Sequence, residues 1–186
     1  MAKNINAFIF ARGGSKEIPN KNLRKVGNKS LVEHSIDSAK EIEEINKIFV
    51  STDSNEIAKV AEQNSAIVIK RPDELATDNA QEFHAWQHAI KEVNEKFGEF
   101  DYFLSLPATS PLRDKIDIEK CISSLKSDVD LVLTMTKANR SPWFNMAKYE
   151  SNGNLRLILK DKNIIRRQDA PDCFDLTTVA YFARAS

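Results

Sequence analysis

Two adjacent glycines and a dense group of cations follow a short apolar run near the start of the chain, in IFARGGSKEIPNKNL (residues 9–23). Residues 12–29 contain six basic side chains and one acid, whereas the whole chain carries 27 of each and no net charge. Glycines allow a sharp turn with uncovered backbone amides, which together with cations form a site for a compact polyanion. The alternative is an ordinary turn with solvated lysines.

This loop differs from two common phosphate-binding motifs. It lacks the G-x-x-x-x-G-K-[ST] spacing of a P-loop and the G-x-G-x-x-G fingerprint of dinucleotide-binding folds. Pro19 stiffens the loop, which suits a segment that must hold one shape. The sequence therefore predicts a phosphate site of another kind.

Short apolar runs alternate with segments of helical period. The expected strands are residues 5–11, 45–52, 66–70, 102–106 and 130–136, and the expected helices are 31–42, 55–64, 80–97 and 115–126. This alternation predicts an α/β fold, a Rossmann-like, mostly parallel layered sheet with helices on both faces, whose ligands collect at the carboxyl ends of the strands. In the helix at 80–97 we expect an apolar stripe of Phe83, Trp86, Ile90, Val93 and Phe97.

The pattern changes after about residue 138. Ser151-Asn152-Gly153-Asn154 is typical of a hairpin turn between two strand-like runs. We interpret residues 139–175 as a small β excursion within a single domain, residues 1–186, that serves as an oligomer contact or a lid.

Composition excludes several classes of protein. Balanced charge argues against a nucleic-acid-coating protein, and no apolar run reaches the ~20 residues of a membrane span. We expect no signal peptide and a cytoplasmic location, in which Cys121 packs in the core rather than in a disulfide.

The opening loop resembles the signature loop of the acylneuraminate cytidylyltransferases, the CMP-sialic acid synthetases. Further matches follow in order along the chain: VSTDSNEIA (50–58), KRPDELATD (70–78), TSPLR (109–113) and RRQDAP (166–171). The resemblance implies a nucleotidyltransferase that joins CTP to a nonulosonic acid, a sialic-acid-like sugar acid, and releases pyrophosphate.

The resemblance also implies roles for individual residues. The triphosphate-holding residues would be Arg12, Gly13, Ser15, Lys16 and Lys21, with Asn22 fixing the nucleotide. Lys21, with Arg12, is the candidate for stabilising the charge that develops on the α-phosphate and the leaving pyrophosphate.

Two further positions match the base site of that family. Arg71 matches a residue that donates to the acceptors of cytosine; its alternative is a surface ion pair with Asp73 or Glu74. Asp78 matches the stretch that closes over the base.

Thr109, Ser110 and Arg113 follow the fourth strand and are candidates for the rim that binds the substrate; the alternative for Ser-Pro is a turn and helix start. Arg167, with Gln168 beside it, matches an arginine that reaches the sugar's carboxylate, often across the interface of a homodimer. Tyr181 matches an aromatic residue at the acceptor site.

The chain departs from the family pattern at four places. Pro107 replaces a sugar-contacting glutamine, Phe144 replaces a basic residue, residues 175–178 replace an Asn-Gly pair, and Gln81-Glu82 replaces two small hydroxyl residues. Three of the four lie on the acceptor side, so we expect a modified acid such as legionaminic or pseudaminic acid rather than N-acetylneuraminic acid.

The family also implies Mg²⁺ held by an Asp-x-Asp pair beyond the last strand, and this sequence has no such pair there. The metal ligands are therefore unassigned. Asp53 is a weak substitute and is expected to cap the helix near Asn55. His84 and His88 are expected to be a solvated pair rather than a zinc site.

Two alternatives remain open at this point. One is an enzyme like the CMP-Kdo synthetases, although their opening loop more often reads Ser-Thr-Arg-Leu-Pro-Gly-Lys. The other is a non-catalytic relative that binds a nucleotide or a sugar acid.

Overall fold

A computed structural model describes residues 3–186, and the chain divides into two compact units. The first unit contains the chain up to Thr134 together with Thr178–Ser186, and the second unit is Met135–Thr177. The second unit overlaps the predicted β excursion.

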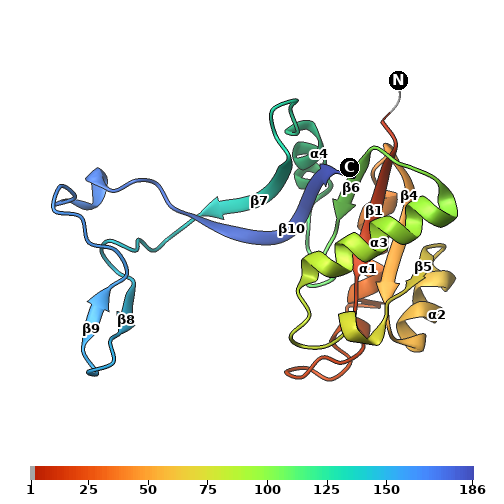
Figure 1. Ribbon diagram of the computed structural model, residues 1–186, viewed down its shortest axis with the longest axis horizontal. Helices are drawn as coiled ribbons and strands as arrows, with labels where there is room; N and C mark the ends of the chain where they lie inside the picture. The colour runs from red at the N-terminus through yellow and green to blue at the C-terminus, as the bar shows by residue number, and fades with distance from the viewer. Residues whose placement is uncertain (1–2) are drawn as a thin grey trace. The chain divides into compact units, whose positions relative to one another are not determined.

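A six-stranded sheet has the strand order β5-β4-β1-β6-β10-β7 (Figure 1). Its strands are β1 (Ile5–Phe10), β4 (Ile45–Thr52), β5 (Ile67–Lys70), β6 (Tyr102–Ser105), β7 (Leu131–Lys137) and β10 (Phe174–Arg184). β1 runs parallel to β4 and β6, and β4 runs parallel to β5, whereas β10 is antiparallel to β6. The predicted mostly parallel sheet is confirmed.

Helices cover both faces of the sheet in the first unit. They are α1 (Leu31–Lys40), α2 (Asn55–Gln63), α3 (Glu82–Phe97) and α4 (Lys115–Ser123). Ile5, Ala7 and Ile9 of β1 pack in a core that also contains buried side chains of α1, α2 and α4. Phe8 points to the other core, which contains Ala89 and Val93 of α3. This alternation along β1 follows from the two-residue period of a strand.

The expected stripe on α3 is wrong in part. The buried positions are Ala85, Ala89 and Val93, while Phe83 is exposed and Phe97 is half exposed. Small alanines let the helix lie close to the ring of Phe8 and its neighbours, so the larger aromatic side chains flank this contact instead of filling it.

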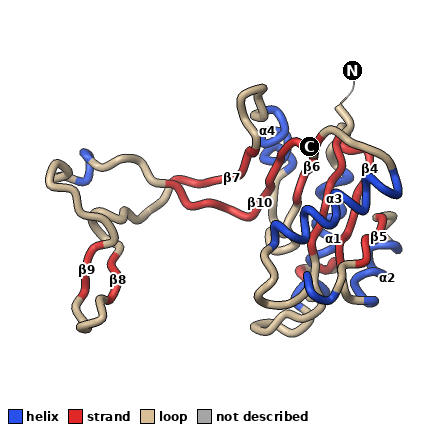
Figure 2. Tube along the Cα trace, viewed as in Figure 1, coloured by secondary structure: helices blue, strands red, loops and turns tan. Residues whose placement is uncertain are grey.

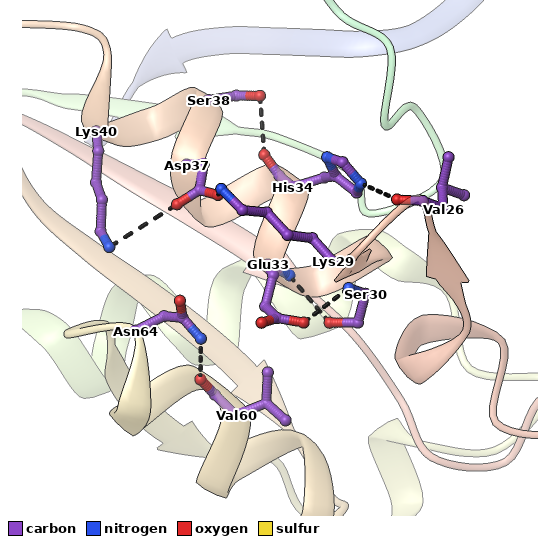
Figure 3. Close-up of polar contacts among 10 residues, drawn as sticks. All are labelled: Val26, Lys29, Ser30, Glu33, His34, Asp37, Ser38, Lys40, Val60 and Asn64. Carbon is purple, nitrogen blue, oxygen red and sulfur yellow. Dashed lines mark hydrogen bonds and ion pairs between the residues drawn. The ribbon is translucent and has the colours of Figure 1, made fainter.

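Helix α1 begins with a reciprocal cap (Figure 3). Ser30 Oγ accepts a hydrogen bond from the Glu33 amide at 3.3 Å, and the Ser30 amide donates to Glu33 at 2.7 Å. These bonds lower the pKa of Glu33. The cap follows a short ladder between β2 (Lys25–Val26) and β3 (Lys29–Ser30), and so fixes where the chain leaves the cationic loop.

The second unit contains the predicted hairpin. β8 (Ala147–Tyr149) pairs with β9 (Leu155–Leu157), and Gly153 in the turn has φ of 82°, a conformation that favours glycine. Short 3₁₀ turns complete the chain at Lys21–Leu23, Asp73–Leu75 and Arg167–Asp169.

Cys121 is buried, as predicted, and burial raises the pKa of its thiol to about 11. Among the described residues, none of the helices has the length and apolar character needed to cross a bilayer.

Candidate active site

The cationic loop after β1 is anchored to the end of β4. The Ala11 amide donates to the Ser51 carbonyl at 3.0 Å, and the Gly13 amide donates to Asp53 Oδ1 at 2.9 Å. The predicted cap role of Asp53 is therefore wrong, because Ser54 accepts the capping bond of α2 from the Ile57 amide. Asp53 fixes the loop instead.

Gly13 is needed for a close approach and not for an unusual backbone angle. A Cβ atom there would lie 3.0 Å from the Cβ of Ser54, and Gly13 and Gly14 are absent from the positive-φ residues of the described chain. Asn20 takes the left-handed conformation in this loop, with φ of 54°. The expectation that the glycine amides are uncovered is wrong at Gly13, and the Ser15 amide is also bonded, to the Gly13 carbonyl at 3.0 Å.

Asp78 joins two of the cations in the loop. Arg12 Nη2 lies 2.8 Å from Asp78 Oδ1, Lys16 Nζ contacts Asp78 Oδ2, and Arg12 Nη1 donates to the Ala76 carbonyl at 3.3 Å. The hydrogen bonds from Lys16 and Arg12 lower the pKa of Asp78. The segment after β5 is thereby tied to the loop after β1, and both lie at the same edge of the sheet (Figure 2).

Lys21 and Asn22 lie in the turn that ends the loop. Asn22 is only 6% exposed, and its side-chain amide donates to the Arg12 carbonyl at 3.0 Å. Lys21 forms no ion pair within residues 3–186 and faces a pocket. Its ammonium group is therefore available to an anionic ligand.

Arg71 is buried, with 6% of its surface exposed. Its Nε donates to Ser51 Oγ at 3.2 Å, its Nη2 donates to the Ser51 carbonyl at 2.9 Å, and its guanidinium lies 5.6 Å from the centre of the Phe10 ring. Desolvation lowers its pKa. The alternative of a surface ion pair with Asp73 or Glu74 is wrong, since burial and the bonds to Ser51 direct the side chain into the protein.

One pocket of about 540 Å³ brings most of the predicted residues together. It is lined by the predicted Arg12, Ser15, Lys16, Lys21, Asn22, Arg71, Asp78, Thr109 and Tyr181. The predicted Gly13 is not part of this lining; its amide bonds to Asp53. Four cationic side chains stand against three acidic ones, Glu17, Asp78 and Glu82.

The segment after β6 forms another part of the pocket wall. Pro107 and Thr109 line the pocket, whereas Ser110 does not; its hydroxyl donates to the Thr178 carbonyl at 2.9 Å. Arg113 Nη2 donates to the Pro107 carbonyl, and desolvation lowers the pKa of Arg113 to about 10. Ser110 and Arg113 thus support the wall from behind.

Tyr181 of β10 lies in the pocket beside Trp86. The two ring centres are 5.4 Å apart, and burial, followed by the charge of Glu82, raises the pKa of Tyr181. Trp86 also contacts Phe10 and Phe103 at 6.3 and 5.2 Å between ring centres. An aromatic group therefore backs this side of the pocket.

Arg167 and Gln168 belong to the second unit. They line a hollow of about 320 Å³ there with Lys137 and Arg140, and Arg167 Nη2 donates to the Asn139 carbonyl at 3.1 Å. Phe144, the departure noted in the sequence, lines another hollow of this unit.

Sequence reasoning assigned no role to several residues of the pocket. The unassigned members of its lining include Phe10, Thr77, Glu82 and Thr178. Glu82 and Thr178 lie at positions where the sequence departs from the family pattern. The departure identified these positions but did not indicate what their side chains contact. Phe10 was read only as part of a buried strand.

The described residues offer no ready-made metal centre. No group of three His, Cys, Asp or Glu side chains lies together among them. The carboxylates of Asp53 and Asp78 are bonded to the Gly13 amide and to Arg12 with Lys16, respectively. These carboxylates alone do not make a site for the implied Mg²⁺, which is usually held by one or two carboxylates together with substrate phosphates.

The fold resembles those of solved cytidylyltransferases. It matches a CMP:2-keto-3-deoxy-manno-octonic acid synthetase complexed with CTP, with a TM-score of 0.71, 14% identity, and coverage of 98% of this chain and 75% of that one. A 4-diphosphocytidyl-2C-methyl-D-erythritol synthase from Anaerococcus prevotii gives a TM-score of 0.64 at 14% identity, with coverage of 100% and 73%. The chain therefore has a nucleotidyltransferase fold.

Sequence comparison identifies the family. The cytidylyltransferase profile matches residues 7–171, and the chain belongs to that family. It is 34% identical over 180 residues to the "Post-translational flagellin modification protein B" of Campylobacter coli, and 35% identical over 180 residues to the CMP-N,N'-diacetyllegionaminic acid synthase of Campylobacter jejuni. Each match covers 95% of this chain and 76% of the relative.

A third relative is more distant. The N-acylneuraminate cytidylyltransferase of Escherichia coli is 33% identical over 142 residues, which cover 75% of this chain and 33% of that protein. The resemblance noted in the sequence is confirmed at the level of the family.

Proposed function

We propose that the protein transfers the cytidylyl group of CTP to a nonulosonic acid and releases pyrophosphate. The observation that carries this proposal is one pocket in which the cationic loop and the buried Arg71 meet. Such a pocket offers cations for a triphosphate and a buried guanidinium as a donor for a base. In the reaction, the anomeric oxygen of the acid bonds to the α-phosphorus while the bond to the β-phosphate breaks.

The loop residues neutralise the charge that moves during this transfer. Lys21, which has no competing ion pair in the described part of the chain, stabilises the α-phosphate and the leaving pyrophosphate. Arg12 and Lys16 exchange Asp78 for phosphate oxygens when the nucleotide binds. The Asn22 amide holds the Arg12 backbone in place, so the loop is ordered before the substrate arrives.

We propose a modified nonulosonic acid as the acceptor. Support comes from the relative named for N,N'-diacetyllegionaminic acid and from Pro107, which lines the pocket with no side-chain donor. Thr109 and Tyr181 line the same pocket, and we assign them to the acceptor. Arg167 and Gln168 of the second unit remain candidates for binding its carboxylate.

We further propose a homodimer, with Mg²⁺ as the cofactor and the cytoplasm, the site of CTP, as the location. Dimerisation is supported by the exposed apolar side chains of the second unit, such as Tyr149, Leu155, Ile165 and Leu176, which are 66–80% exposed. Mg²⁺ is proposed from the resemblance alone, and removal by EDTA with add-back tests it.

The direct test measures pyrophosphate release from CTP and Mg²⁺ with N,N'-diacetyllegionaminic, pseudaminic, N-acetylneuraminic and Kdo acids. We expect a modified nonulosonic acid to give the highest kcat/KM. A clear preference for N-acetylneuraminic acid would refute the acceptor assignment, and a preference for Kdo would favour the Kdo alternative. Nucleotide binding without release of pyrophosphate with any acid would indicate a non-catalytic relative.

A further inference from the structure

Glu82 is an acidic side chain in a pocket that is proposed to bind a tetra-anion. It is the first residue of α3 and lines the pocket with Arg71, Ala85 and Tyr181. Asp78, another acid of this lining, is engaged by two cations, whereas Glu82 forms no ion pair within the described chain. A carboxylate placed there repels phosphate, so its natural ligand is a hydrogen-bond donor.

The carboxylate of Glu82 is oriented by its own helix. Trp86 Nε1, one turn along α3, donates to Glu82 Oε1 at 3.3 Å. The Trp86 ring is fixed in turn by Phe103 and Tyr181, at 5.2 and 5.4 Å between ring centres. Oε2 accepts no hydrogen bond from the described residues, so one oxygen is held and the other is available to a ligand.

Arg71 and Glu82 stand at the two ends of the segment that joins β5 to α3, and both line the pocket. The bonds to Ser51 use Nε and Nη2 of Arg71, and Nη1 has no protein acceptor among the described residues. Desolvation lowers the pKa of Arg71, and the charges of Asp53 and then Glu82 act in the opposite direction. The wall thus presents one free acceptor and one free donor of opposite charge.

Cytosine and uracil differ in their donors and acceptors. Cytosine has an exocyclic amino donor at C4 and acceptors at N3 and O2, while uracil has an acceptor at C4 and a donor at N3. A carboxylate accepts well from the amino group of cytosine and repels the O4 of uracil. An arginine matches N3 and O2 of cytosine.

We propose that Glu82 is a specificity-determining residue for the base: its free oxygen accepts a hydrogen bond from the amino group of cytosine while Arg71 donates to the other edge of the ring. This assignment rests on the proposed binding of CTP in this pocket. Glu82 thereby selects CTP against UTP, and the rigid Trp86 behind it sets the position of the acceptor.

The test is Glu82→Gln, with CTP and UTP compared by calorimetry and by kcat/KM for pyrophosphate release. The glutamine carbonyl can keep the bond from Trp86, which turns the amide NH₂ toward the base. CTP then loses its acceptor and UTP gains a donor, so the CTP/UTP preference should fall roughly 10-fold or more. Glu82→Ala should weaken CTP and improve UTP only as far as the repulsion of O4 is relieved, so a larger gain for UTP in Glu82→Gln separates the gained donor from the lost acceptor.

Glu74→Gln is the matched control. Glu74 lies in the same segment but outside the pocket lining, and its substitution removes the same charge. It should leave the CTP/UTP preference within about two-fold, since surface charges contribute little. If Glu82 had only a structural role, Glu82→Gln would weaken the binding of both nucleotides equally and change the fluorescence of Trp86. The CTP/UTP preference would then be unchanged.

The failures of the two proposals are distinguishable. Wild-type protein that binds no cytidine nucleotide would overturn the proposed function itself. Wild-type protein that uses CTP, together with a Glu82→Gln variant of unchanged CTP/UTP preference, would overturn the role of Glu82 alone.

Discussion

The two units of the chain differ in how far their side chains are buried. In the first unit, buried polar groups such as Asn22 and Arg71 find partners within the unit, and the apolar side chains form two packed cores. In the second unit, Tyr149 and Leu155 of the hairpin are 77% and 66% exposed. The first unit is built to hold a ligand, and the second presents a surface that gains stability from a partner.

The largest expected effect is at Lys21. Lys21→Ala removes an ammonium group that has no ion pair among the described residues, and should lower kcat about 100- to 1,000-fold with an unchanged melting temperature. Steady-state pyrophosphate release measures it. Lys25→Ala, an exposed lysine outside the pocket lining, is the control and should stay within about two-fold. Near-normal turnover of Lys21→Ala would remove this residue from the mechanism.

The next prediction concerns Arg71, the buried hydrogen-bond donor of the first unit. Arg71→Lys cannot keep both bonds to Ser51, so kcat/KM for CTP should fall about 10- to 100-fold and the melting temperature should fall as well. The reverse exchange at its exposed neighbour, Lys70→Arg, should change neither quantity. Equal behaviour of the two variants would mean that burial of Arg71 has no functional consequence.

The second unit is tested through its hairpin. Tyr149 and Leu155 face each other across the ladder, so the double variant Tyr149→Asp, Leu155→Asp places charge on one exposed apolar pair. We expect the dimer dissociation constant to rise about 10-fold or more, as measured by sedimentation. Leu112→Asp, at an 87% exposed position of the first unit, should leave association unchanged. A monomeric wild type would contradict the proposed dimer.

The smallest effect concerns the two thiols, one in each unit. Burial raises the pKa of Cys121 to about 11, so its reactive thiolate is scarce at pH 8, whereas Cys173 is partly exposed. Ellman's reagent should titrate one thiol in the native protein and two after denaturation. If both thiols reacted rapidly in the native protein, Cys121 would be accessible to the reagent and not buried in the core.

Much of the fold could be predicted from the sequence because β1 and β4 contain short apolar runs, whereas α2 between strands has a helical hydrophobic period. The exposure of Phe83 could not be predicted, since a period identifies a face of the helix but not which of its members pack on the sheet. Ala89 does so because it is small. The family motifs also identified Arg12, Lys21 and Arg71, which line one pocket in the structure.

The partners of these residues were not predictable. Asp53 bonds to Gly13 across 40 residues, and Asp78 bonds to Arg12 across a longer separation, so no local pattern records either contact. The role of Gly13 depends in the same way on the position of Ser54. Such pairings are set by tertiary structure.

The double pairing of Asp78 has a consequence for how the pocket responds to ionic strength. Arg12 and Lys16 already carry an internal counterion, so nucleotide binding exchanges one anion for another and releases few mobile ions from the solvent. The affinity for CTP should therefore decline only gently as salt is added.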